Sequence, residues 1–210
     1  MNRFAATLFA TCALTFAAGA ADAQTVAAAP PAPVAPADVK GGAYTLDASH
    51  GKVTWSVSHV GFSTYIGQFT GVTAKLNLDP KTPSASTLEA TVDTTTVGTL
   101  NAALDTHLKS PDFLDTAKFP TATFKSTSIT STGERTADIA GDLTLHGVTK
   151  PVVIKATFNK AGPGPGGKYR VGFDGETVIK FADFAISPKM GAMLGGETKL
   201  DIEGEFVAAQ

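Results

Sequence analysis

The sequence predicts an all-β protein: an extended antiparallel β-barrel of about eight strands with one or two short helices. Three observations predict it. Apolar residues occupy every second position in many short runs, turn-forming residues separate the runs, and a single segment has helical spacing instead. Sequential strands with short links favour an up-and-down barrel over a sandwich.

One face of each run is expected to point into the barrel. Its residues are Val53, Trp55, Val57 and His59; Val72, Ala74, Leu76 and Leu78; Leu88, Ala90 and Val92; Ile139, Gly141, Leu143 and Leu145; Val152, Ile154, Ala156 and Phe158; Val171, Phe173, Gly175, Thr177 and Ile179; Leu200, Ile202, Gly204 and Phe206. A barrel of about eight strands is either filled by such side chains or holds one small ligand. Periodicity leaves both interiors open.

Turn-forming residues lie between the runs. Residues 79–83 and 130–133 are expected to be loops, and His146–Val148 a tight hairpin connection. Residues 162–167 read GPGPGG, which invites comparison with a phosphate-binding loop. The two prolines remove backbone donors that such a loop uses, so we interpret the segment as a hairpin loop.

The segment Thr99–Phe113 departs from the two-residue period. Its helically spaced residues are Leu100, Ala103, Leu104, His107 and Leu108. We expect one short helix that ends near Ser110-Pro111 and lies across an end of the barrel or over an entrance.

Residues 1–23 have the features of a secretory signal peptide. Arg3 precedes an apolar stretch at residues 4–18, and Ala21-Asp22-Ala23 is an A-x-A cleavage site. A retained anchor is the alternative, but the stretch is shorter than the roughly 20 residues of a spanning helix. The only cysteine, Cys12, lies within this segment, in a poor position for a lipoprotein. The exported chain therefore has no thiol for disulfides, catalysis or metal binding.

Residues 24–41 are rich in Ala and Pro and predict an extended, semi-rigid linker, whereas residues 42–210 form one domain by length. The formal net charge is -2, and removal of the signal peptide takes away one charge of each sign. Because Lys and Arg do not cluster, binding to nucleic acid or to an anionic membrane surface is disfavoured.

No catalytic or metal-binding motif stands out. The four histidines, His50, His59, His107 and His146, are isolated, and neither HExxH nor GxSxG occurs. His59 ends an inward-facing row, where it is either a core histidine or a polar contact at a cavity mouth. The aromatic residues of the connecting segments are likewise either core residues or residues at the rim of an entrance.

Three stretches occur in an order that resembles the YceI-like family. They are SVSHVGFSTYIGQF at 56–69, HLKSPDFLDTAKFPTATF at 107–124 and GDLTLHGVTKPV at 141–152, and the resemblance extends over residues 43–208. It implies a periplasmic, lipocalin-like barrel that binds, sequesters or transports a polyisoprenoid, quinone-like or other lipid-like molecule. It implies neither catalysis nor a cofactor other than that lipid.

The resemblance also implies where the lipid lies. The apolar pocket would be formed by Trp55, Val57, Leu76, Val92, Phe124, Leu143, Ile154 and Phe173, and the rim near the head group by His59, Phe62, Tyr65, Asp105, His107, Phe113 and Phe119. One departure concerns the head group. Leu104 stands where the family commonly has an arginine. If that arginine holds the head group or pairs with a carboxylate, this protein has lost the interaction and would prefer a neutral head group.

Two further hypotheses belong to other classes. The first is an enzyme on isoprenoid or quinone precursors with His59 or His107 as general base. The second is a filled barrel that docks to a protein partner. For the leading hypothesis we expect a small apolar ligand, no nucleic acid, and transient contact with a membrane or membrane protein. The sequence does not give the oligomeric state.

Overall fold

The computed structural model describes residues 34–187, 191 and 193–209. The predicted signal peptide and residues 24–33 of the predicted linker lie outside this part of the chain. Within it, no helix is long and apolar enough to cross a membrane.

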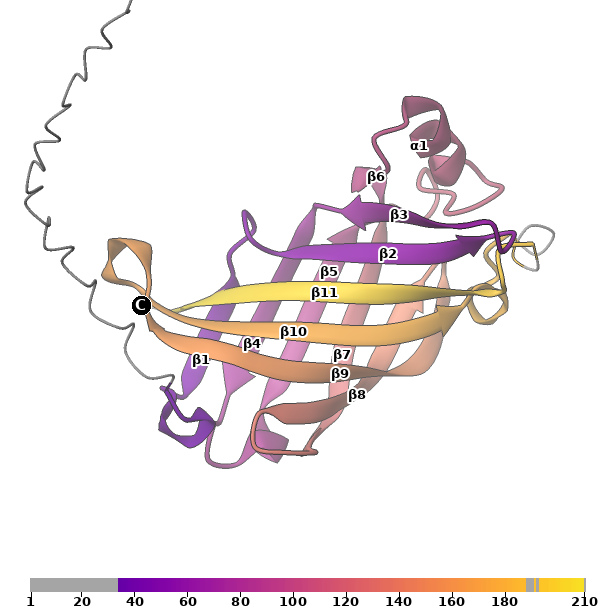
Figure 1. Cartoon of the computed structure of the whole chain (residues 1–210). Helices are drawn as coiled ribbons and strands as arrows, with labels where there is room; N and C mark the ends of the chain where they lie inside the picture. The colour runs from indigo at the N-terminus through magenta and orange to yellow at the C-terminus, as the bar shows by residue number, and fades with distance from the viewer. Residues whose placement is uncertain (1–33, 188–190, 192, 210) are drawn as a thin grey trace, which may run out of the picture. The chain divides into compact units, whose positions relative to one another are not determined.

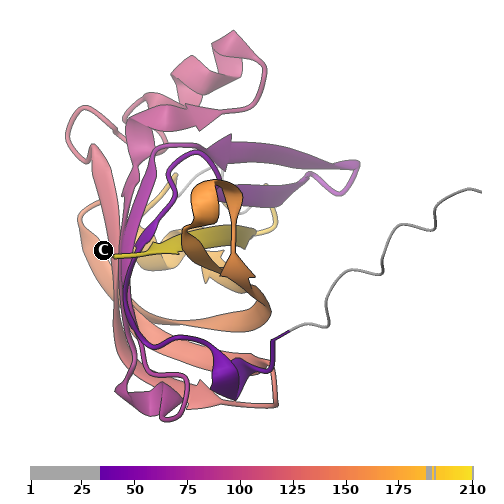
Figure 2. The same ribbon diagram turned by 90° about the vertical axis from the view of Figure 1, so that its left-hand side faces the viewer.

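The described residues form one antiparallel sheet of eleven strands in the order β1-β4-β5-β7-β8-β9-β10-β11-β2-β3-β6. The strands are β1 (Gly42–Leu46), β2 (Lys52–His59), β3 (Ser63–Phe69), β4 (Val72–Leu78), β5 (Thr87–Asp93), β6 (Val97–Gly98), β7 (Thr121–Ser131), β8 (Thr136–Leu145), β9 (Val148–Pro163), β10 (Tyr169–Lys180) and β11 (Glu197–Ala208). An additional β1–β11 pairing closes an eight-stranded barrel from β1, β4, β5 and β7–β11. The sheet curls around an interior (Figures 1 and 2), which confirms the predicted fold class.

The strand β11 pairs with two partners along the same edge. Residues 206–208 pair with β1, whereas residues 199–203 pair with β2. The β2–β3 hairpin thus continues the wall where β1 ends. The far edge of β3 pairs with β6 only at Gln68 and Phe69, so most of that edge carries no strand partner among the described residues. The helix α1 (Ala102–Lys109) follows β6 and lies beside this edge (Figure 1).

The helix lies within the segment predicted to be helical and ends at the expected place. The Asn101 side chain caps its start by accepting a hydrogen bond from the Leu104 backbone N–H at 3.2 Å. The Asp105 carboxylate accepts hydrogen bonds from the backbone N–H and hydroxyl of Thr99, at 2.7 and 2.6 Å. At the other end, the Ser110 hydroxyl donates to the His107 carbonyl. These contacts hold α1 to its own flanking residues, not to the barrel wall.

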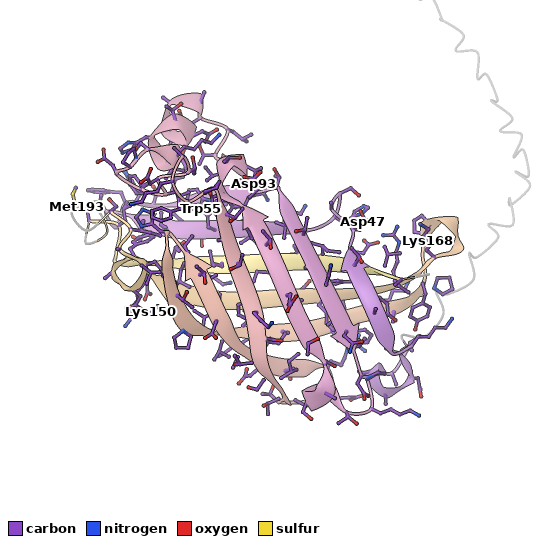
Figure 3. The ribbon with its side chains drawn as sticks, turned by 180° about the vertical axis from the view of Figure 1, so that it is seen from behind. Asp47, Trp55, Asp93, Lys150, Lys168 and Met193 are labelled. Carbon is purple, nitrogen blue, oxygen red and sulfur yellow. The ribbon has the colours of Figure 1, made fainter. Side chains whose placement is uncertain are left out.

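The two ends of the barrel are distinguished below by their contents. The hairpin end carries the β2–β3 turn, α1 and residues 181–187, 191 and 193–196, whereas the ion-pair end carries the β1–β2 and β9–β10 loops. Figure 3 shows Met193 and Lys150 at the hairpin end and Asp47 and Lys168 at the ion-pair end. As predicted, His146 and Gly147 form the tight β8–β9 connection, and residues 164–168 lie in a loop between β9 and β10.

The end of the predicted linker differs from an extended spacer. A 3-10 turn spans Pro36–Asp38, and Val39 is buried in the apolar cluster at the ion-pair end. The Tyr44 hydroxyl donates a hydrogen bond to the Lys40 carbonyl at 2.5 Å. Burial of the Val39 side chain stabilises the turn against the barrel. The composition of this segment, rich in Ala and Pro, does not reveal such a tertiary contact.

Candidate ligand-binding cavity

The barrel encloses a cavity of about 490 Å³. This volume lies within the range of about 300–1,000 Å³ that is usual for small-molecule sites. Side chains from the inward faces of the strands form its wall, together with part of α1. The interior is therefore hollow, and the filled-barrel interpretation does not describe it.

The inward register expected from the sequence agrees closely with the cavity wall. All eight residues predicted for the apolar pocket line the cavity: Trp55, Val57, Leu76, Val92, Phe124, Leu143, Ile154 and Phe173. They come from seven different strands, and each lies on the apolar face of its strand. Whether they contact a ligand stays a prediction.

Two glycines allow large rings to enter this wall. A Cβ atom on Gly141 would collide with the Phe124 ring and the Lys125 carbonyl, and one on Gly67 would collide with the Trp55 indole. Gly141 lies next to Ser126 of β7, close to a bulge in that strand. The missing side chains leave space for the aromatic rings that border the cavity.

The residues predicted for the rim divide into two groups. His59, Tyr65, His107 and Phe113 line the cavity. Phe62, Asp105 and Phe119 lie outside its lining: Phe62 is 89% exposed, Asp105 binds the Thr99 turn, and the Phe119 ring packs against His146 with centroids 4.7 Å apart. Phe62 falls outside because the alternation of β2 ends at His59, and the turn then carries the chain away from the interior.

Several lining residues were missed by the analysis of strands. Leu104 and Leu108 of α1, Leu114 beyond it, and Phe181, Ile186 and Leu194 between β10 and β11 all line the cavity. Helical spacing marks Leu104 and Leu108 as one apolar face, so this signal was sufficient to find them. The irregular segment after β10 has no periodicity that could reveal its inward residues.

Polar groups are few in the cavity wall, and several are already satisfied. The Thr94 hydroxyl donates to the Phe119 carbonyl at 2.7 Å, and the Thr198 hydroxyl donates to the Ser56 carbonyl at 3.0 Å. Arg135 also reaches the lining, but its Nε donates to the Phe158 carbonyl and its guanidinium lies over the Phe158 ring. These groups therefore have little capacity left for a ligand.

The hairpin end offers polar groups that remain available. Among the described residues, the imidazoles of His59 and His107 make no hydrogen bond, and both border the cavity. The His107 ring meets the Phe113 ring edge-on at 5.0 Å, and Tyr65 stacks on Trp55 at 6.5 Å. A neutral imidazole can donate one hydrogen bond and accept another, so this end can bind a polar head group.

A cluster of ionisable side chains lies outside the cavity at the ion-pair end. Arg170 donates hydrogen bonds to the carboxylates of Asp47, at 2.6 Å, and of Glu205. Hydrogen bonds from Ser49 and Arg170 lower the pKa of Asp47 well below its ordinary value. Asp47, His50 and Glu205 lie close enough to hold a metal ion, but the Arg170 guanidinium already forms ion pairs with both carboxylates. We interpret the cluster as a structural ion pair.

Comparisons with known proteins agree with the fold. A family model described as the YceI-like domain matches residues 44–206. A UPF0312 protein of Ectopseudomonas mendocina (strain ymp) is 47% identical over 164 residues, which cover 77% of this chain and 86% of that protein.

Solved structures show the same architecture. Burkholderia cenocepacia BcnA superposes with a TM-score of 0.69 at 23% identity, covering 78% of this chain and 99% of that one. The Campylobacter jejuni YCEI protein gives a TM-score of 0.65 at 29% identity, with 71% and 88% covered. A polyisoprenoid-binding domain from Saccharophagus degradans, implicated in plant cell wall breakdown, gives 0.63 at 16% identity, with 81% and 100% covered.

Proposed function

Since the chain belongs to the YceI-like family, we propose that it binds a polyisoprenoid, quinone-like or other lipid-like molecule inside its barrel. It sequesters or transports this molecule without chemical change. The observation that carries the proposal is the cavity of about 490 Å³, whose wall consists of the apolar faces of the strands. The polyisoprenoid-binding domain of similar fold supports the ligand class.

The hydrophobic effect supplies the binding energy. At about 0.8 kcal/mol per buried CH₂ group, a five-carbon isoprene unit contributes roughly 4 kcal/mol on transfer from water. A few units then exceed the cost of association, which is estimated at about 4–15 kcal/mol. A tail bound in this way leaves slowly, because its departure exposes the same apolar surface to water.

The ends of the cavity determine how the ligand lies. The apolar tail occupies the barrel between Trp55 and Phe173, and the polar head group lies near His59, Tyr65 and His107. The position where the family commonly has an arginine is occupied by Leu104, which lines the cavity. A neutral head group that exchanges hydrogen bonds with imidazole fits this wall better than a phosphate, because a buried charge needs a partner.

Export to the periplasm is part of the proposal. The predicted signal peptide at residues 1–23 supports it. In that compartment the protein has access to membrane lipids, and transient contact with a membrane would allow the ligand to be loaded or released.

Binding without catalysis agrees with the surroundings of the histidines. A general base that acts on a bound substrate is normally oriented by a second polar group. In the described part of the chain, neither His59 nor His107 forms an ion pair with a carboxylate, whereas His50, outside the cavity, does. This arrangement favours a binding role for the two cavity histidines.

Native mass spectrometry of the protein purified from its exported compartment tests the proposal directly. We expect a stoichiometric adduct that organic extraction identifies as an isoprenoid or quinone-like lipid. A protein that carries no adduct and does not take up an added polyprenol would contradict the proposal.

Replacement of Phe124 by Asp tests the location of the ligand. The side chain lines the cavity and is buried, so a carboxylate there should weaken polyprenol binding at least about tenfold, as measured by a fluorescent-lipid displacement titration. Val178→Asp is the matched control, because Val178 is 54% exposed and does not line the cavity. Equal affinities of the two folded variants would refute the assignment of Phe124.

A further inference from the structure

Four exposed apolar side chains lie on the β2–β3 hairpin and directly before α1. These residues, Val60, Phe62, Ile66 and Leu100, are called the hairpin rim below. Phe62 is 89% exposed, Ile66 is 57% exposed and Leu100 is fully exposed. Gly98 of β6 pairs with Gln68 of β3 in an antiparallel register. Leu100 lies two residues after Gly98 and Ile66 lies two residues before Gln68, so both lie on the same side of this pair. The rim therefore follows the edge of β3 from the turn toward the start of α1 (Figure 1).

The two segments that carry the rim contain no charged residue, and the nearby Asp105 carboxylate is hydrogen-bonded to Thr99. No Asp, Glu, Lys or Arg occurs between Lys52 and Lys75, or between Asp93 and Asp105, although such residues make up 17% of the protein. Charged side chains normally surround exposed apolar residues and keep them in water. Their absence from both segments makes this surface inexpensive to desolvate, and it matches a surface that is itself neutral.

The backbone holds two of these side chains outward in an unfavourable conformation. Val60 has φ of 56° and Leu100 has φ of 63°, both in the left-handed region. This conformation is uncommon for residues other than glycine, and for a β-branched residue such as Val60 it is a genuine outlier. Strained residues of this kind concentrate at binding sites and switch regions.

The rim adjoins the cavity. His59 directly precedes Val60, Tyr65 lies between Phe62 and Ile66, and both line the cavity. Behind Leu100, α1 contributes Leu104 and Leu108 to the cavity wall, yet none of the α1 residues is buried. Elements with so few buried side chains open most readily, so α1 is a part of the cavity wall that can move to admit a lipid.

We propose that the hairpin rim is the surface with which the protein contacts a bilayer of electrically neutral lipids. Phe62 and Leu100 insert between the head groups, and the lipid passes along α1 into the cavity. Protruding single side chains suit insertion into the soft interface of a bilayer, whereas a protein interface has a packed core with a polar rim. The role of this contact in lipid loading rests on the proposed function, but the contact of the protein with the bilayer can be measured without a bound ligand.

The test uses vesicles of phosphatidylcholine and the delipidated protein, with the bound fraction measured by co-sedimentation. Phe62→Asp and Leu100→Asp are each expected to weaken vesicle binding about tenfold. Val153→Asp introduces the same charge at an exposed apolar residue of β9, a strand that β10, β11 and β2 separate from β3, and is expected to bind like the wild type. Phe62→Trp is expected to bind more tightly, because Trp favours the membrane interface.

The outcomes separate this inference from the proposed function. The membrane role of the rim is wrong if Phe62→Asp and Leu100→Asp bind the vesicles as the wild type does, if the control variant loses as much binding as they do, or if the wild type does not bind them. Capture of a periplasmic protein by the rim in place of vesicles would overturn it as well. If the rim variants lose vesicle binding while the wild type carries no lipid, the inference holds and the proposed function fails.

Discussion

The two ends of the barrel each have a buried apolar cluster, but they differ in how their surface elements are held. At the ion-pair end, Arg170 links Asp47 of the β1–β2 loop to Glu205 of β11, and Val39 is buried over the apolar cluster. At the hairpin end, α1 buries none of its residues, and Phe62 and Leu100 project into water. Figure 3 shows Asp47 and Met193 at these opposite ends of the molecule.

This difference places the stability of the barrel and the entry of a ligand in different parts of the molecule. Tightly packed and paired groups raise the free energy of local opening, whereas sparse burial lowers it. The hairpin end also has a packed part, since Phe184 and Ile186 belong to a buried apolar cluster. We therefore expect α1 and the β2–β3 hairpin, and not the whole end, to open while the rest of the barrel is maintained. A carrier with two firm ends would exchange its ligand slowly, and one with two loose ends would not retain a long tail.

The largest expected effect comes from truncation of one apolar residue near each end. Phe158 is buried in the cluster of the ion-pair end and packs on Phe173 with ring centroids 5.6 Å apart. Phe158→Ala should lower the free energy of unfolding by about 3 kcal/mol, and Leu104→Ala by less than about 1 kcal/mol. Urea denaturation followed by circular dichroism measures both values. Comparable losses would show that α1 stabilises the barrel as much as its core does.

A smaller effect is expected from a methyl group added to the barrel wall. In Gly141→Ala the new Cβ collides with the Phe124 ring and the Lys125 carbonyl, which should cost about 1–3 kcal/mol of stability. Gly98→Ala is the matched control in β6 at the loosely paired edge, where a Cβ meets no atom within 4 Å. Thermal denaturation of the two variants makes the comparison. If Gly98→Ala is the more damaging, the edge beside α1 is under tighter constraint than its packing indicates.

The sequence was sufficient to predict the barrel and most of its inner face, because inward residues recur at every second position. Strands such as β4 and β10 could be read in this way residue by residue. Helical spacing likewise revealed α1. By contrast, Val39 and Ile186 lie in irregular segments, where burial depends on tertiary packing and no local period records it.

The hairpin rim shows a second limit of prediction from the sequence. Phe62 belongs to the same run of aromatic and apolar residues as Tyr65, yet only Tyr65 lines the cavity. The left-handed conformation of Val60 and Gly61 sends the chain outward, and spacing alone does not report backbone conformation. The exposure that motivates the membrane inference could therefore be found only in three dimensions.

The smallest effect concerns the pH dependence of the ion-pair end. Hydrogen bonds from Ser49 and Arg170 lower the pKa of Asp47 in the folded protein below its ordinary value of 3.8. The folded state thus favours the carboxylate, and this stabilisation is complete above pH values near the ordinary pKa. As the pH falls further, the unfolded chain takes up the proton first, so the stabilisation declines.

Asp47→Asn removes this contribution. The difference in unfolding free energy between the wild type and the variant should be largest near pH 7 and should shrink below about pH 4. Urea titrations at several pH values measure that difference. Glu203 titrates in the opposite sense, because burial and the nearby Asp174 raise its pKa, but it is present in both proteins and its effect cancels. A difference that stays constant into acid would show that Asp47 acts by its shape and neutral hydrogen bonds, and that its charge does not stabilise the ion-pair end.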